Sequence, residues 1–121
     1  MHEKSVLVVE DDENIREVLQ LVLESEGYLV HTAENGQEGV KFLKENAETS
    51  LILLDLMMPV MDGWAFLEQR KLDPRLAAIP VVVLSASGLS EKPEGATAFL
   101  SKPVELHNLL RVTQSHCLKV A

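Results

Sequence analysis

Four short apolar runs of this sequence each lead directly into side chains that can do chemistry. Two of the runs are followed by carboxylates, one by a hydroxyl, and one by a hydroxyl and an amine. The groups are Glu10-Asp11-Asp12 after residues 6–9, Asp55 after 51–54, Ser85 after 80–84, and Ser101-Lys102 after 98–100. A charge-free run of this kind is typical of a strand buried on both faces of a parallel sheet.

If these groups meet, their types indicate one kind of chemistry. Carboxylates placed close together repel each other unless a cation lies among them, and oxygen ligands favour a hard ion such as Mg²⁺. A lysine and a hydroxyl beside that ion suit an oxyanion, most naturally a phosphoryl group. Aspartate can also be a nucleophile and become an acyl phosphate. The pattern therefore predicts a phosphoacceptor site with Asp55 at its centre.

Strands and helices alternate along the chain, which indicates crossover units and a parallel sheet. Because parallel strands end at the same edge of the sheet, the four groups are expected to converge there. Apolar residues at helical spacing predict helices near 15–23, 36–43, 64–72 and 106–117. Gly27 and Pro74 mark helix ends, and Asn35 is expected to cap a helix. The expected strands are 6–9, 28–30, 51–54, 80–84 and 98–100.

Composition limits the classes of function. The 121 residues include 46% hydrophobic residues, which suits one compact domain, and the net charge is −8. An acidic chain lacks the cationic face that direct nucleic-acid binding needs. There is no apolar stretch of membrane-spanning length and no signal-peptide pattern, so we expect no membrane association and a cytoplasmic location. The single cysteine, Cys117, fits a reducing compartment and is expected to be a small apolar residue of the last helix.

The ordered motifs closely resemble those of the receiver domain of two-component response regulators. They are residues 8–12 (VVEDD), 53–63 (LLDLMMPVMDG), 83–86 (VLSA) and 95–103 (GATAFLSKP). The resemblance covers nearly the whole chain. It implies an α/β fold, a flavodoxin-like doubly wound five-stranded parallel sheet of order 2-1-3-4-5 with helices on both faces. Residues 1–121 are accordingly expected to form a single receiver domain, with no effector domain in this chain.

The resemblance also implies a role for each site residue. Asp55 would be phosphorylated, with Lys102 and Ser85 binding the phosphoryl oxygens. Glu10, Asp11, Asp55 and the backbone carbonyl of Met57 would hold Mg²⁺, leaving Asp12 to begin a helix. Phe99 resembles the aromatic switch residue, and a cis Lys102–Pro103 bond would help to aim the lysine.

The implied partner is a histidine kinase or a histidine phosphotransfer protein, with an unknown downstream protein as the output. Such a module is not an ordinary enzyme, because it catalyses only its own phosphorylation and dephosphorylation. Two alternatives stay open. One is a scaffold that binds proteins without being phosphorylated. The other is an aspartyl-phosphate hydrolase, which would need an acid two positions after the nucleophile, where this chain has Met57.

One interval departs from the receiver pattern. Between Ser85 and Lys102 the family has a loop, a full fourth helix and the last strand, and here the interval is short by about one and a half helical turns. It also contains Gly88, Pro93 and Gly95, which are poor residues for a helix interior. We therefore expect the fourth helix to be shortened or missing, and the output face to be unusual.

Overall fold

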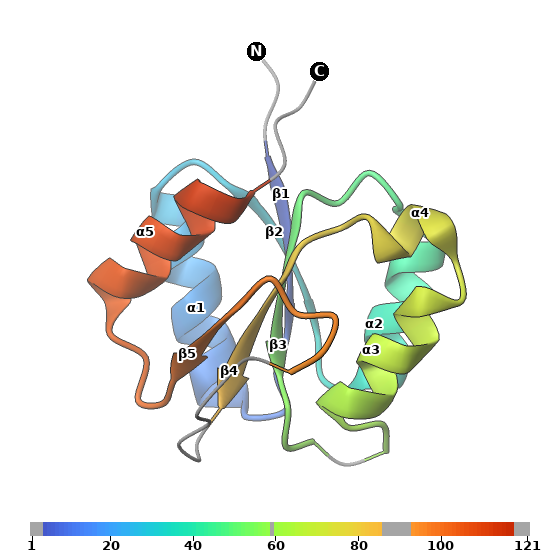
Figure 1. Ribbon diagram of the computed structural model, residues 1–121. Helices are drawn as coiled ribbons and strands as arrows, with labels where there is room; N and C mark the ends of the chain where they lie inside the picture. The colour runs from blue at the N-terminus through green and yellow to red at the C-terminus, as the bar shows by residue number, and fades with distance from the viewer. Residues whose placement is uncertain (1–3, 59, 86–92, 118–121) are drawn as a thin grey trace.

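The computed structural model describes residues 4–58, 60–85 and 93–117 of the chain. A five-stranded, fully parallel sheet of order β2-β1-β3-β4-β5 lies at the centre, as expected (Figure 1). The strands are β1 (Ser5–Val9), β2 (Leu29–Ala33), β3 (Leu51–Asp55), β4 (Val81–Ser85) and β5 (Ala98–Ser101). The helices are α1 (Glu13–Ser25), α2 (Gly36–Glu45), α3 (Gly63–Lys71), α4 (Pro74–Ala77) and α5 (Leu106–His116).

The helices cover both faces of the sheet. α1 and α5 pack on one face, while α2, α3 and α4 pack on the other (Figure 1). Strands β1, β3 and β4 are almost completely buried, because alternate side chains of each strand enter the two cores. Every residue of 6–9, 51–54 and 81–84 is apolar and buried, so the edge formed by the carboxyl ends of these strands is supported by both cores.

Short polar side chains start the helices that leave this edge. Asp12 accepts a hydrogen bond from the backbone N–H of Ile15 at 3.1 Å, and Asp62 accepts one from Ala65 at 2.9 Å. Asn35 caps α2 in the same way, as the sequence predicted. The role expected for Asp12, that of a helix-start residue, is thereby confirmed.

The helix end predicted before Pro74 is confirmed, because α3 ends at Lys71. Pro74 also occupies the first turn of a further, one-turn helix, α4, where its missing N–H costs nothing. The expected bounds of one strand were wrong. β2 begins one residue later than expected and continues to Ala33, because its partner β1 pairs with it along its full length. The last predicted helix is confirmed as α5, which buries Leu109, Val112 and Thr113 and leaves Leu106 at its first turn 42% exposed.

The interval that departs from the receiver pattern is described only in part. Residues 86–92, where most of the shortened fourth helix would fall, lie outside the described residues, and residues 93–97 contain no helix. The helix labelled α4 precedes β4 and is a different element. Within the described ranges, no helix is both long enough and apolar enough to cross a membrane.

Candidate functional site

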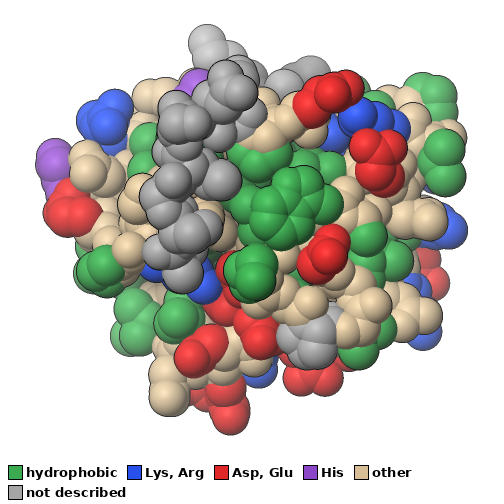
Figure 2. All heavy atoms as spheres, turned by 60° about the horizontal axis from the view of Figure 1, so that its bottom comes forward, with side chains coloured by type: hydrophobic (Ala, Val, Ile, Leu, Met, Phe, Trp, Pro, Cys, Tyr) green, Lys and Arg blue, Asp and Glu red, His purple; other side chains and the backbone are tan. Residues whose placement is uncertain are grey.

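Strand register brings the four predicted groups to one place. Val9 lies beside Leu54 in the sheet, so Glu10 and Asp55 follow on neighbouring strands. Asp55 lies beside Leu84 and Ser85 beside Ser101, so Ser85 and Lys102 complete the same edge. Figure 2 turns this edge toward the viewer and shows acidic side chains gathered on it, with hydrophobic side chains around them.

Three carboxylates form the acidic part of the site. Oxygen atoms of Glu10, Asp11 and Asp55 lie within 4.8 Å of one another. Glu10 and Asp55 are buried, at 0% and 3% exposure, whereas Asp11 is exposed. Asp12 is not part of this cluster, because its side chain caps α1. The acidic pair chosen from the sequence, Glu10 and Asp11, is therefore the pair that faces Asp55.

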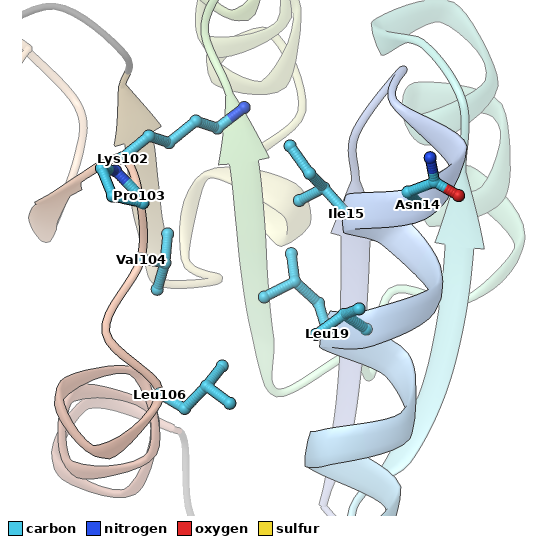
Figure 3. Close-up of a pocket in the computed structure, with 8 residues that line it drawn as sticks. Asn14, Ile15, Leu19, Lys102, Pro103, Val104 and Leu106 are labelled. Atoms are coloured by element: carbon cyan, nitrogen blue, oxygen red, sulfur yellow. The ribbon is translucent and has the colours of Figure 1, made fainter.

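Lys102 joins two of these carboxylates. Its Nζ lies 2.8 Å from Glu10 Oε1 and 3.3 Å from Asp55 Oδ1. The Lys102–Pro103 peptide bond is cis, as expected. Lys102 is one of the residues that line an apolar cavity of about 280 Å³ between α1 and residues 102–106, and Figure 3 shows its side chain extending from the end of β5 toward the tip of β3. The stem of the lysine thus lies beside apolar side chains while its amine stays with the acids.

Burial and charge change the proton affinities of this pair. Burial raises the pKa of Glu10 to about 7, although the hydrogen bond from Lys102 acts in the opposite direction. Burial by itself would lower the pKa of Lys102, but the hydrogen bond that Lys102 donates to Glu10 and the charges of Glu10 and Asp55 outweigh it and raise that pKa. Lys102 therefore keeps its positive charge at neutral pH, and Glu10 is protonated more easily than an ordinary carboxylate.

The loop after Asp55 is folded back against the site. The backbone N–H of Met57 donates to Asp55 Oδ1 at 3.3 Å, and that of Gly63 donates to the Leu56 carbonyl at 2.9 Å. A Cβ on Gly63 would lie 2.7 Å from Leu56 Cα, so only glycine allows α3 to begin this close to β3. Val60 has a φ of +69°, a left-handed conformation that costs a β-branched residue energy.

Ser85 and Phe99 occupy the positions expected for a phosphate-binding hydroxyl and a switch residue. Ser85 is buried at the end of β4, and its carbonyl accepts a hydrogen bond from the backbone N–H of Lys102 at 2.7 Å. Phe99 is half-buried and packs against the core on the α2–α3 face. The binding and switching roles of these two residues, and the Met57 carbonyl as a metal ligand, stay predictions.

One contact at this edge was not foreseen from the sequence. Arg16, in the first turns of α1, donates from Nη1 to the backbone carbonyl of Glu10 at 2.9 Å and to that of Asp11 at 3.4 Å. The only sequence signal for it is a basic residue four positions after the helix cap Asp12, a spacing at which long side chains fold back toward the helix start.

The donor set of the acidic cluster fits Mg²⁺. Carboxylate oxygens are the ligands that this ion prefers, and it is usually held by one or two carboxylates with its remaining positions filled by water and phosphate. Of the three acids that would hold such an ion, Glu10 and Asp55 are buried and Asp11 is exposed, so the cluster can be reached from solvent. Within the described residues, the single cation in contact with the cluster's carboxylates is Lys102, whose one charge does not balance three carboxylates.

A pH dependence of stability follows from the buried state of Glu10. Its pKa is about 7 in the folded protein and near 4.5 when unfolded, so between these values the folded state binds more protons. We expect the free energy of unfolding in EDTA to fall by about 1–3 kcal/mol as the pH rises through this range. Urea unfolding of the wild type and Glu10→Gln at several pH values measures this contribution. The prediction would be contradicted if the free energy of unfolding of the wild type, relative to that of Glu10→Gln, did not fall as the pH rises.

Comparisons with known proteins agree with this geometry. The family model described as the response regulator receiver domain matches residues 6–114. An uncharacterised 14.6 kDa protein of Leptolyngbya boryana is 33% identical over 93% of this chain and 89% of its own length. The response regulator Rre1 of Synechocystis is 34% identical over 92% of this chain, which spans only half of that protein. The crystal structure of the chemotaxis protein CheY4 of Vibrio cholerae superposes with a TM-score of 0.87 at 29% identity, covering 95% of this chain and 99% of that one.

Proposed function

The chain belongs to the family of response regulator receiver domains, and from this we propose that it accepts a phosphoryl group on Asp55 from a phosphohistidine of a partner protein. The observation that carries the proposal is the position of Lys102. Its amine contacts Asp55 and Glu10 together, at the edge where Asp11 and Ser85 also lie. A carboxylate with a fixed cation on one side and an acidic cluster on the other is suited to receive an anionic phosphoryl group.

In the proposed reaction, an Asp55 carboxylate oxygen attacks the phosphorus in line with the phosphorus–nitrogen bond of the phosphohistidine. That bond breaks, its electron pair stays with the imidazole, and a new oxygen–phosphorus bond makes an acyl phosphate. Lys102 stabilises the charge on the phosphoryl oxygens, and the Ser85 hydroxyl donates to one of them. Glu10, Asp11, Asp55 and the Met57 carbonyl would hold Mg²⁺, and the chemistry supplied by that ion would be neutralisation of negative charge during the transfer.

The modification would change which contacts are available at this edge. A phosphoryl group adds about −1.5 to −2 charges and three acceptor oxygens. The Lys102 amine contacts Glu10 and Asp55 before phosphorylation, and it would move toward the phosphoryl oxygens afterwards. Ser85 would follow the phosphoryl oxygen, and Phe99 on the neighbouring strand would repack. These contacts exist in one state only, which allows phosphorylation to shift a conformational equilibrium. Water would then hydrolyse the acyl phosphate and reset the module.

The partners follow from the chemistry. A phosphohistidine is supplied by a histidine kinase or by a histidine phosphotransfer protein. We expect this exchange to take place in the cytoplasm, where the kinase can use ATP. The downstream partner would be a protein that distinguishes the two states. The chain itself would catalyse only its own phosphorylation and dephosphorylation, and position 57, where a hydrolase of the aspartyl-phosphate type needs an acid, holds methionine.

The test is uptake of a phosphoryl group from a small donor. We expect intact-mass spectra of the wild type incubated with acetyl phosphate and Mg²⁺ to show a single phosphoryl adduct, and spectra taken with EDTA to show none. Hydroxylamine should remove the adduct, because an acyl phosphate is labile to it and a phosphoserine is not. A folded protein that binds Mg²⁺ but gives no adduct, and does not respond to beryllofluoride, would favour the scaffold alternative.

A further inference from the structure

The acidic loop between β1 and α1 has a backbone anchor in Arg16. The side chain is half-buried, and its Nη1 donates to the carbonyls of Glu10 at 2.9 Å and Asp11 at 3.4 Å. These are the two residues whose carboxylates face Asp55. The guanidinium therefore contacts the backbone of both members of the acidic pair, which precede Arg16 by six and five residues in the sequence.

Arg16 acts on the backbone and leaves the carboxylates free. In the described part of the chain, no carboxylate lies within ion-pair distance of its guanidinium, although four acids, at positions 10–13, precede it closely in sequence. The side chain of Glu10 is instead engaged by Lys102 and by the backbone N–H of Asp12 at 3.1 Å. A basic side chain used only to neutralise the cluster would be expected to pair with a carboxylate, as Lys102 does.

Few other described hydrogen bonds hold the backbone of the acidic loop between β1 and α1. The N–H of Glu10 donates to the Ala33 carbonyl at 3.0 Å, which continues the sheet by one residue, and Asp12 already belongs to the helix start. The Glu10 and Asp11 carbonyls lie past the last strand residue and have no strand partner in the ladder. Without an anchor, mutual repulsion of the carboxylates and backbone entropy would both favour a more open loop.

We propose that Arg16 is a positioning residue that holds the backbone of Glu10 and Asp11 so that their carboxylates are in place for a divalent cation before it arrives. The inference rests on the proposed function, because that function gives the acidic pair its metal. The consequence concerns the affinity for Mg²⁺. Arg16 should strengthen Mg²⁺ binding even though its own positive charge repels the ion, because the fixed loop has less freedom to lose on binding.

The experiment is a calorimetric titration of Mg²⁺ into the wild type, Arg16→Met, Arg16→Lys and Arg111→Met. Arg111 is exposed on α5, so its substitution removes the same charge without touching the loop. We expect Arg16→Met to weaken Mg²⁺ binding by about tenfold, Arg111→Met to leave it unchanged, and Arg16→Lys to retain part of the affinity, because one amine can still reach a carbonyl. Urea unfolding in EDTA reports whether each variant is folded.

The outcomes separate this inference from the proposed function. If Arg16→Met is folded and binds Mg²⁺ as tightly as Arg111→Met, or more tightly, Arg16 does not have the proposed role. The phosphoacceptor proposal would still stand. If Arg16→Met does not fold, Arg16→Lys decides at equal net charge: an affinity equal to that of the wild type overturns the inference, and a weaker one supports it. A wild type that binds no Mg²⁺ would overturn both.

Discussion

Asp55→Asn is expected to take up no phosphoryl group at all from acetyl phosphate and Mg²⁺. An amide lacks the anionic oxygen that attacks phosphorus, and three other carboxylates at this edge already have partners. Glu10 is held by Lys102, and Asp12 and Asp62 cap helices. The variant should fold, because it removes one of two buried carboxylates that repel each other and so lowers the electrostatic cost of the site. Intact mass after incubation, compared with the wild type at equal times, measures the loss.

Asp62→Asn is the matched control for this substitution. Asp62 lies seven positions later in the loop that follows Asp55, is exposed, and caps α3 through the backbone N–H of Ala65. Asparagine caps a helix as well as aspartate does, so the variant should fold and should be phosphorylated like the wild type. Full phosphorylation of Asp55→Asn, or loss of phosphorylation in a folded Asp62→Asn, would contradict the assignment of the nucleophile.

Lys102→Met is expected to slow phosphorylation by about 100-fold or more, the usual effect of removing one charged group that stabilises a transition state. It takes away the cation that lies 3.3 Å from Asp55 and 2.8 Å from Glu10. Methionine has a similar length and an apolar stem, so contacts beside the apolar cavity are kept. The variant should also make the pKa of Glu10 still higher, because two buried carboxylates would then have no counter-charge. The initial rate of adduct formation at saturating Mg²⁺ is the measurement.

Lys71→Met is the control for the lost charge. Lys71 pairs with Glu68 at 3.5 Å and with the exposed Glu94 at 3.3 Å, well away in sequence from the acidic cluster. Exposed pairs of this kind contribute little to stability, so the variant should be phosphorylated at the rate of the wild type. A folded Lys102→Met that reacts within about twofold of Lys71→Met would show that the lysine does not stabilise the transferring group.

The sheet and the convergence of the site could be predicted because both depend on strong signals. The runs at 51–54 and 81–84 are apolar without interruption, and such runs, alternating with helices, are compatible with few arrangements other than a parallel sheet. Once the strands are parallel, the positions of Glu10, Asp55, Ser85 and Lys102 at one edge follow from their places in the sequence. Sequence position alone therefore located the site.

Contacts that depend on side-chain reach could not be predicted in the same way. No sequence pattern shows that Lys102 lies between Glu10 and Asp55, or that Arg16 reaches back to two carbonyls, because both require the loop conformation. The one-turn helix α4 was missed because Pro74 both ends one helix and suits the start of another.

The most direct test of the central claim is to locate the phosphoryl group on the chain. The wild type would be treated with acetyl phosphate and Mg²⁺, reduced with borohydride, which converts an aspartyl phosphate to homoserine, digested, and sequenced by tandem mass spectrometry. The account predicts homoserine at position 55 and nowhere else, and its absence when EDTA replaces Mg²⁺. Homoserine at position 11, 12 or 62, or a phosphoryl group on a serine with Asp55 unchanged, would contradict it.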